Sequence, residues 1–392
     1  IMSNSFKTFL KHTAKDFHNQ SVNPPVVRAS TIIFKSMKDI RKTQAKAIKN
    51  PTGGHYDYGR QGTSTTYILQ KILTKLEESY HVFTTPTGFG AVFLAIFSVT
   101  RPGDEIIVAD PVYSPTRILT ENFLNEFNIK TTFYDPHDLK TLEKSITNKT
   151  KLIFVENPGS NSFDFQDLGK IISIAKKHKI LTAMDNTWGT PYFLKPIKLG
   201  FDMAIVSATK YYSGHSDVMG GSLAVNKKVF PKVKAAERIT GLRLGPDDAY
   251  LITRGLRTLD VRLDRHRENA KKVAEFLSKN KKFKLLYPYK KDSYNFRMWK
   301  KYYSGASGLM GVQIKSKNVN SIRKFVNSLK LFGYGYSWGG FESLALHQEF
   351  RETGKRKYLK LKKDEHLVRF HIGLEDPSDL IADIKQALKH LK

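Results

Sequence analysis

The stretch VSATKYYSGHSD, residues 206–217, joins an apolar run to a polar turn that contains glycine. Its first residues complete FDMAIVSATK (201–210), whose length and apolar content are typical of a buried strand. Lys210 therefore stands where this strand ends, just after Ser207 and Thr209. The chain has 65 lysines and arginines, most of which must be solvated, so it is this position and not the residue type that distinguishes Lys210.

Similar apolar runs precede residues 201–210 and alternate with amphipathic helical patterns such as DLGKIISIAKKHK. The alternation is typical of βαβ units, which form a parallel sheet with helices on both faces. The runs are EIIVAD (105–110), KTTFYD (130–135), KLIFVEN (151–157) and ILTAMDN (180–186). Ligands of such sheets bind at the carboxyl ends of the strands. We therefore expect one shared rim for the polar residues that follow the runs, namely Tyr113, Asn157, Asp185, Thr209 and Lys210.

The order of these patterns divides the chain into three parts. Residues 1–54 form a basic arm, and residues 55–250 hold the strands and helices of a large α/β domain. Residues 251–392 begin with a long basic helix, which the strand-like runs FKLLYP, SGLMGVQIK and EHLVRFHIG follow. We expect this last part to be a smaller α+β domain, because 392 residues are too many for one core.

The composition excludes several classes of site and partner. The absence of cysteine excludes disulfides and thiolate chemistry, and it fits a cytoplasmic protein. The longest apolar stretch, AVFLAIFSV (91–99), is too short to cross a bilayer. The net charge of +29 raises the question of a nucleic-acid partner, but the basic residues are spread along the chain, with one dense run, GKRKYLKLKK (354–363). We interpret the charge as solvated helix faces.

Asp185 and Lys210 form a pair with two interpretations. Asp185 in MDNTW follows an apolar run, so its carboxylate is partly desolvated and needs a partner. Lys210 is one predicted strand further along the chain and provides either a simple ion pair or one end of a cofactor site. Pyridoxal phosphate (PLP) needs a lysine for covalent attachment and an acid opposite its ring nitrogen. The spacing of the two residues leaves both interpretations open.

Two motifs have the features of a phosphate site. TPTGFGA places Gly88 at the start of an apolar helix, where free backbone N–H groups attract a dianion, and SATK supplies the hydroxyls of Ser207 and Thr209. HYDYGRQGTST adds Tyr58 and the guanidinium fork of Arg60. Ordinary turn chemistry and a surface pair remain the alternatives.

The remaining candidate residues lie in loops and in one late strand. Tyr113 in DPVYSPT is suited to stacking on a flat ring or to filling a gap. Arg369 lies in a half-buried strand, where a cation needs a carboxylate from the protein or from a substrate. YSWGGFESL places Ser337 and Trp338 in a loop that we expect to face a cleft.

Other chemistries find less support in the sequence. The chain contains no P-loop, no H-E-x-x-H and no G-x-S-x-G motif. GHSD (214–217) has the look of a metal-binding pair, but His215 and Asp217 lack a third ligand. We interpret both residues as part of a turn.

The motifs occur in an order that resembles the Cys/Met-metabolism family of PLP-dependent enzymes from about residue 20 to the C-terminus. They are YGRQGTST, GFGA, DPVYSPT, ENPGS, MDNTW, SATKYYSGHSD, ITRGLRTLDVR, SWGGFESL and RFHIGLED. The resemblance implies the fold of type I PLP-dependent transferases, with a mostly parallel, seven-stranded large sheet and a small C-terminal α+β domain. It also implies a homotetramer of two active dimers, with the N-terminal arm in subunit contacts.

The resemblance implies a role for each motif residue. Lys210 is the Schiff-base lysine and the base at the substrate Cα, and Asp185 pairs with the ring nitrogen. The implied cofactor-binding residues are Tyr58, Arg60, Gly88, Phe89, Tyr113, Asp185, Ser207, Thr209 and Lys210, of which Tyr58 and Arg60 come from a neighbouring subunit. Phe89 is bulkier than the residue common in the family, so we expect only its backbone to contact the phosphate. The implied substrate-binding residues are Tyr58, Ser337, Trp338 and Arg369.

Trp338 is similar to the residue that the cystathionine β-lyases of this family carry. The implied activity is cleavage of L-cystathionine to homocysteine, pyruvate and ammonia in methionine biosynthesis, with Tyr113 assisting proton transfer. The same cofactor chemistry also permits amino-acid (alanine) racemase and cysteine desulfhydrase activities. An anion- or nucleic-acid-binding protein on the same scaffold is the alternative from another class. We expect no metal and no membrane partner.

Overall fold

A computed structural model describes residues 5–13, 21–288, 291, 293–348, 356–358 and 361–391. The chain forms two compact units, each made of several segments. Unit 1 comprises Ile1–Val99, Lys195–Ser213 and Asp217–Asp260, and unit 2 comprises Thr100–Leu194, Gly214–Ser216 and Val261–Lys392. The expected domain limits at residues 54 and 250 stay a prediction.

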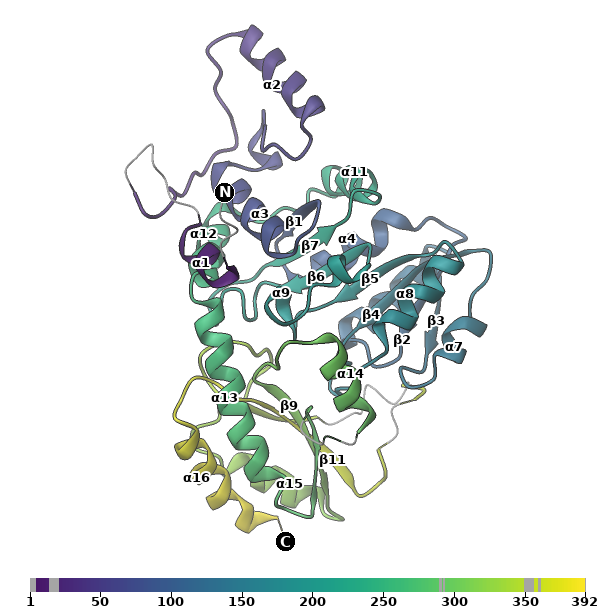
Figure 1. Ribbon diagram of the computed structural model, residues 1–392, viewed down its shortest axis with the longest axis vertical. Coiled ribbons are helices and arrows are strands. Elements are labelled where there is room, and N and C mark those ends of the chain that lie inside the picture. The colour runs from purple at the N-terminus through teal and green to yellow at the C-terminus, as the bar shows by residue number, and fades with distance from the viewer. Residues whose placement is uncertain are drawn as a thin grey trace. The chain divides into compact units, whose positions relative to one another are not determined.

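The described residues of unit 1 contain three strands. Strand β7 (Gly221–Val225) pairs antiparallel with both β1 (His81–Thr85) and β6 (Met203–Ser207). Helix α4 (Gly88–Val99) is apolar on almost every side and is largely buried. The other helices of this unit are α1 (Phe6–Lys11), α2 (Met37–Lys49), η1 (Gly59–Gln61), α3 (Ser64–Leu76), α10 (Pro196–Leu199), α11 (Phe230–Thr240) and α12 (Pro246–Leu256). Helix α2 extends away from the other helices of the unit (Figure 1), and none of its residues is buried.

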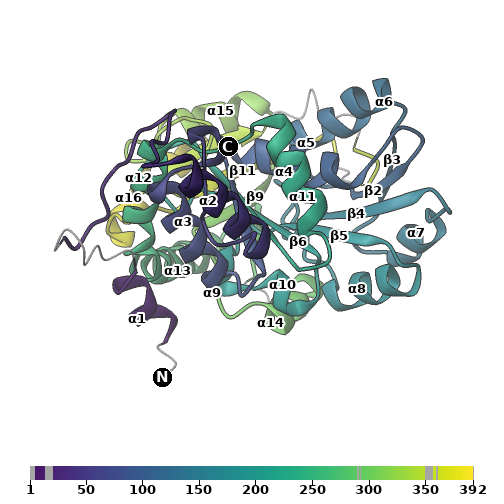
Figure 2. The ribbon, with the colours of Figure 1, turned by 90° about the horizontal axis from the view of Figure 1, so that it is seen from above.

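Unit 2 contains four parallel strands in the order β5-β4-β2-β3. They are β2 (Glu105–Ala109), β3 (Lys130–Tyr134), β4 (Thr150–Glu156) and β5 (Leu181–Asp185). Their helices are α5 (Ser114–Ile118), the π-helical η2 (Leu119–Phe123), α6 (Leu124–Glu126), α7 (Leu139–Lys144), α8 (Leu168–Lys177) and α9 (Thr190–Phe193). Figure 2 shows α5 and α6 on one face of these strands and α7 and α8 on the other. Burial on both faces explains why the strands are almost continuously apolar.

The rest of unit 2 is built on a four-stranded antiparallel sheet in the order β10-β11-β9-β8. The strands are β8 (Phe283–Leu286), β9 (Leu309–Lys315), β10 (Leu344–Gln348) and β11 (Glu365–His371). The helices are α13 (Leu259–Leu277), which begins at the unit boundary, α14 (Tyr294–Tyr302), α15 (Val319–Asn327), α16 (Pro377–Ala387) and η3 (Leu388–His390). One apolar core joins this sheet to α13, α15 and α16, with Phe325 and Phe370 fully buried in it.

The strands of the two units are ordered β1-β7-β6-β5-β4-β2-β3 in one seven-stranded sheet. The expected fold class is thus confirmed, with a large and mostly parallel sheet, flanking helices and a smaller sheet near the C-terminus. In the part of the chain that the structure describes, no helix has the length and apolar character that a membrane span requires.

Candidate functional site

The Lys210 turn closes directly onto the end of strand β6. The backbone N–H of Lys210 donates to the carbonyl of Ser207 over 3.1 Å. Thr209 is fixed from both sides, because its hydroxyl donates to the carbonyl of Gly220 over 3.2 Å and accepts from the Gly220 N–H over 3.0 Å. Lys210 is half-buried at this place. The turn therefore fixes the backbone of Lys210 relative to the two hydroxyl-bearing residues.

The first turn of α4 lies against the same strand end. A Cβ atom added to Gly88 would stand 2.4 Å from the Ser207 Oγ, so only glycine fits there. The hydroxyl of Thr87 accepts the N–H of Gly90 over 2.9 Å and caps the helix. Phe89 keeps its ring 39% exposed, which is consistent with a backbone contact alone at this residue. The structure thus brings together Gly88, Ser207, Thr209 and Lys210 in unit 1, beside a helix N-terminus that favours a phosphate.

Tyr58 and Arg60 lie on a separate turn of unit 1. The ring of Tyr58 is 48% exposed, and the Arg60 Nη1 donates to the carbonyl of Arg238 at the end of α11 over 2.8 Å. Gly59 is required between them, because an added Cβ would stand 1.8 Å from the carbonyl oxygen of Ala29. That these two side chains reach the cofactor of a neighbouring subunit stays a prediction.

Asp185 lies in unit 2, at the end of β5. Its Oδ1 accepts the backbone N–H of Thr187 over 2.9 Å and the hydroxyl of the same residue over 2.6 Å. The neighbouring strand places Glu156 opposite Asp185 in the β4–β5 register. Two carboxyl groups therefore share the end of this strand pair.

Glu156 is a polar residue of this site that the sequence patterns did not single out. Its Oε2 accepts the backbone N–H of Tyr113 over 2.6 Å. Loss of hydration raises the pKa of the Glu156 carboxyl well above its ordinary value, and the nearby Asp185 raises it further. The sequence pattern could have indicated Glu156, because this residue ends the apolar run before NPGS in the same way that Asp185 ends the run before NTW.

Tyr113, Asp185 and Arg369 belong to one electrostatic group within unit 2. Partial burial raises the pKa of the Tyr113 phenol, the carboxylates of Glu156 and Asp185 raise it further, and Arg369 opposes them. The guanidinium of Arg369 loses hydration in strand β11, which lowers its pKa. The phenol of Tyr113 therefore keeps its proton at neutral pH.

The Arg369 Nη2 donates to the carbonyl of Ser337 over 3.1 Å. Ser337 has a φ of 80°, a left-handed conformation that is rare for a residue other than glycine. Such strained positions are concentrated at functional sites. Trp338 follows Ser337 directly and is half-buried. That Ser337, Trp338 and Arg369 bind a substrate stays a prediction.

Two other expectations need comment. Asn157 directly follows β4, as expected; it is 1% exposed, donates to Tyr303 over 2.9 Å and accepts from the Gln166 N–H over 2.7 Å. His215 and Asp217 are exposed, and the described residues contain no group of three metal-ligating side chains.

Comparison with known proteins places these residues in a family. A family model described as Cys/Met metabolism PLP-dependent enzyme matches residues 7–389. The chain is 36% identical to a cystathionine beta-lyase of Bordetella avium, with 94% of this chain and 92% of that protein covered. It is 35% identical to an L-alanine/L-glutamate racemase of Wolbachia pipientis, with 95% and 93% covered. The crystal structure of metB from Corynebacterium glutamicum is similar with a TM-score of 0.90 at 30% identity, with 100% and 99% covered. The chain therefore belongs to the Cys/Met-metabolism family of PLP-dependent enzymes.

Proposed function

We propose that the chain is a carbon–sulfur β-lyase that cleaves L-cystathionine to homocysteine, pyruvate and ammonia. Family membership establishes PLP as the cofactor and C–S lyase or synthase chemistry as the broad class. The observation that supports the finer assignment is the contact of the desolvated Arg369 guanidinium with the carbonyl of Ser337, the residue directly before Trp338, a tryptophan typical of the β-lyases.

The residues of the chain fit the cofactor. Gly88, Ser207 and Thr209 would hold the phosphate, because the missing Cβ at Gly88 leaves the α4 N-terminus open beside the Ser207 hydroxyl. Lys210 would attach the cofactor, Asp185 would pair with the ring nitrogen, and Tyr113 would stack on the ring. When bound, PLP withdraws electrons from the substrate Cα and so makes its proton acidic.

The side chains would then bind the substrate and move two protons. The Arg369 guanidinium would take the α-carboxylate as a charge-assisted pair, which offsets its loss of hydration. The Lys210 Nζ would remove the Cα proton. The Tyr113 Oη, whose raised pKa keeps it protonated, would donate to the leaving sulfur. Tyr58 and Trp338 would contact the part of the substrate beyond the reacting carbons.

We further propose that the enzyme acts in the cytoplasm, in methionine biosynthesis, as a homotetramer whose subunits share Tyr58 and Arg60. The exposed apolar side chains of the N-terminal arm support a second copy as its partner. Ile33 is 91% exposed and Ile48 on α2 is 81% exposed.

Absorbance and product analysis test the proposal. The purified protein should show a PLP band near the visible edge that is lost in Lys210→Ala and kept in Lys227→Ala, which removes an exposed lysine. Removal of the base should lower kcat by about 10²- to 10⁴-fold. Absence of the band in the wild-type protein, together with salt-sensitive binding of an oligonucleotide, would favour the anion-binding alternative instead.

A racemase is the second candidate, because the relative named L-alanine/L-glutamate racemase is 35% identical to this chain, against 36% for the cystathionine beta-lyase of Bordetella avium. Incubation with L-cystathionine, L-cysteine and L-alanine separates the activities. Pyruvate with homocysteine supports the β-lyase, and sulfide from cysteine supports a desulfhydrase. Formation of D-alanine without pyruvate from cystathionine would overturn the lyase assignment.

A further inference from the structure

Arg356 differs from the other basic residues that the structure describes in the run at 354–363. The structure describes residues 356–358 and 361–363 of this run. Lys357, Lys362 and Lys363 are exposed, as expected for a solvated face, but Arg356 is only 6% exposed. A buried guanidinium needs partners that replace its hydration. Its contacts therefore indicate a specific role.

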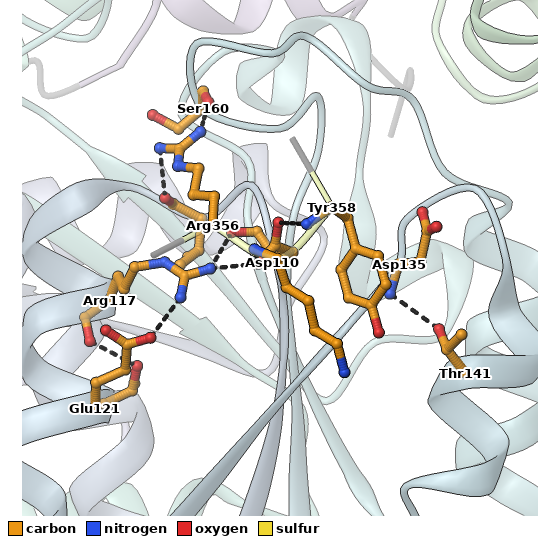
Figure 3. A network of polar contacts seen from close by, with 11 residues as sticks. Asp110, Arg117, Glu121, Asp135, Thr141, Ser160, Arg356 and Tyr358 are labelled. Atoms are coloured by element: carbon orange, nitrogen blue, oxygen red, sulfur yellow. Dashed lines mark hydrogen bonds and ion pairs between the residues drawn. The ribbon is translucent and has the colours of Figure 1, made fainter. Parts of the chain in front are cut away.

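The Arg356 guanidinium joins two loops of unit 2. Nη1 donates to the carbonyl of Ser160 over 2.9 Å, and Nη2 donates to the carbonyl of Val112 over 3.3 Å. Figure 3 shows the side chain extending between the Ser160 loop and the strand end at Asp110. The carboxylates of Glu156, Asp110 and Asp164 attract this cation, whereas Arg117 repels it.

The backbone that follows Arg356 is fixed as well. The N–H groups of Lys357 and Tyr358 donate to the two carboxylate oxygens of Asp110 over 3.1 and 2.9 Å. Asp110 is fully buried and also accepts from the Arg117 Nη2 over 2.5 Å. The segment 356–358 is thus held against the end of strand β2 by its side chain and its backbone together.

The loop at residues 110–113 leads to Tyr113, and hydrogen bonds hold each of its residues. Apart from the Asp110 contacts, the Ser160 N–H donates to the carbonyl of Pro111 over 2.6 Å, and the Tyr113 N–H donates to Glu156. Arg356 donates to the remaining carbonyl, that of Val112. Loss of the guanidinium would leave two carbonyl groups, at Val112 and Ser160, without this donor.

We propose that Arg356 is a positioning residue that fixes the loop 110–113 and, through it, the phenol of Tyr113. This inference deepens the proposed function, because it rests on the role of Tyr113 in that reaction. Arg356 itself contacts the backbone of the loop and acts only through it.

Hydrogen exchange on the full chain tests the positioning without any need for turnover. Arg356→Met keeps the apolar stem and removes the donors, and Lys357→Met is the matched control, since that side chain is exposed. Amides of residues 112–118 should exchange at least about tenfold faster in Arg356→Met and at the wild-type rate in Lys357→Met. Amides of α16 should be unchanged in both. Unchanged exchange at 112–118, or equal acceleration in α16, would overturn the proposal.

A double-mutant cycle then tests the link to catalysis. Arg356→Met should lower kcat about tenfold in the wild-type background and have little effect on kcat in Tyr113→Ala, where no phenol remains to be positioned. Arg356→Lys, which keeps the charge and one donor, should recover part of the loss. Equal losses in both backgrounds would overturn the inference. An inactive wild-type protein would refute the proposed lyase, while the exchange experiment would still decide the role of Arg356.

Discussion

His266 should make the unfolding of the protein take up protons in mild acid. Its imidazole on α13 is fully buried, and Nδ1 lies 2.8 Å from the carbonyl oxygen of Ile372. Burial lowers the pKa of His266 to about 4, the contact with Ile372 opposes this shift, and Arg262 adds to it. The ring also faces His371, at 5.2 Å between centroids. The folded protein therefore prefers neutral His266.

The sign and the size of the change in stability follow from the pKa values of His266 in the unfolded and in the folded protein. Unfolded His266 has a pKa of about 6.5, so the stability that its neutral form provides is complete above that pH and is lost as the pH falls toward 4. At pH 5 the imidazole is almost fully protonated in the unfolded chain and about a tenth protonated in the folded chain. Unfolding should thus bind about 0.9 proton at this residue, and the contribution of His266 to the stability should be about 2 kcal/mol smaller at pH 5 than at pH 8.

Proton uptake during urea unfolding at pH 5 measures this quantity directly, without a two-state assumption. His266→Asn keeps a donor near the Ile372 carbonyl but removes the titration, so the variant should bind about 0.9 proton fewer than wild type. His137→Asn is the control. Asp164 raises the pKa of His137 by a hydrogen bond, so this imidazole is protonated in both states at pH 5. Equal uptake by wild type and His266→Asn would refute the reasoning.

Three further outcomes are expected. His137→Asn should lower stability at pH 5.5 and have no effect at pH 9. The raised pKa of His137 stabilises the fold below about pH 6.5, and this contribution is lost as the pH rises through the pKa of His137 in the folded protein. Thermal shifts at the two pH values check this. Phe325→Ala should cost about 3–5 kcal/mol, since the ring is fully buried in the apolar core around the four-stranded sheet, and an unchanged urea midpoint would contradict it. Asp383→Ala should cost about 1–3 kcal/mol, because the carboxylate accepts the N–H groups of residues 330 and 331 over 2.8–2.9 Å; Asp383→Asn, which keeps an acceptor, should cost less in the same urea titration.

The parallel strands were predictable because burial on both faces leaves a continuous apolar run. KLIFVEN and ILTAMDN coincide with β4 and β5 to within one or two residues. β7 and β10 escaped prediction, since GSLAV has small residues and LALHQ alternates weakly. β7 pairs with β6 and also with β1, which is distant in sequence, and a local pattern does not report such a pairing.

The candidate site was predictable where a polar residue ends an apolar strand. This rule placed Asp185 and Lys210 at strand ends, as the structure does, and it would have found Glu156 had it been applied to β4. It also placed Asn157 at a strand end, directly after β4, where the side chain hydrogen-bonds Tyr303 and the Gln166 N–H. It could not find Arg356, because in the sequence a buried arginine within a lysine-rich run is the same as a solvated one.

The burial of Arg356 shows that the basic residues of the chain are not all solvated surface residues. Asp110, Glu156 and Asp185 all lie at the ends of parallel strands in unit 2, and loss of hydration raises the pKa of the Glu156 carboxyl. Two arginines offset this charge from within the protein, Arg117 by its ion pair with Asp110 and Arg356 by its attraction to Glu156. A buried arginine and its carboxylate partners stabilise the fold only while both are present. Removal of either partner should therefore cost more free energy of unfolding than the loss of a surface ion pair. The described part of the run at 354–363 thus combines exposed lysines with a buried counter-charge for the acidic strand ends beside Tyr113.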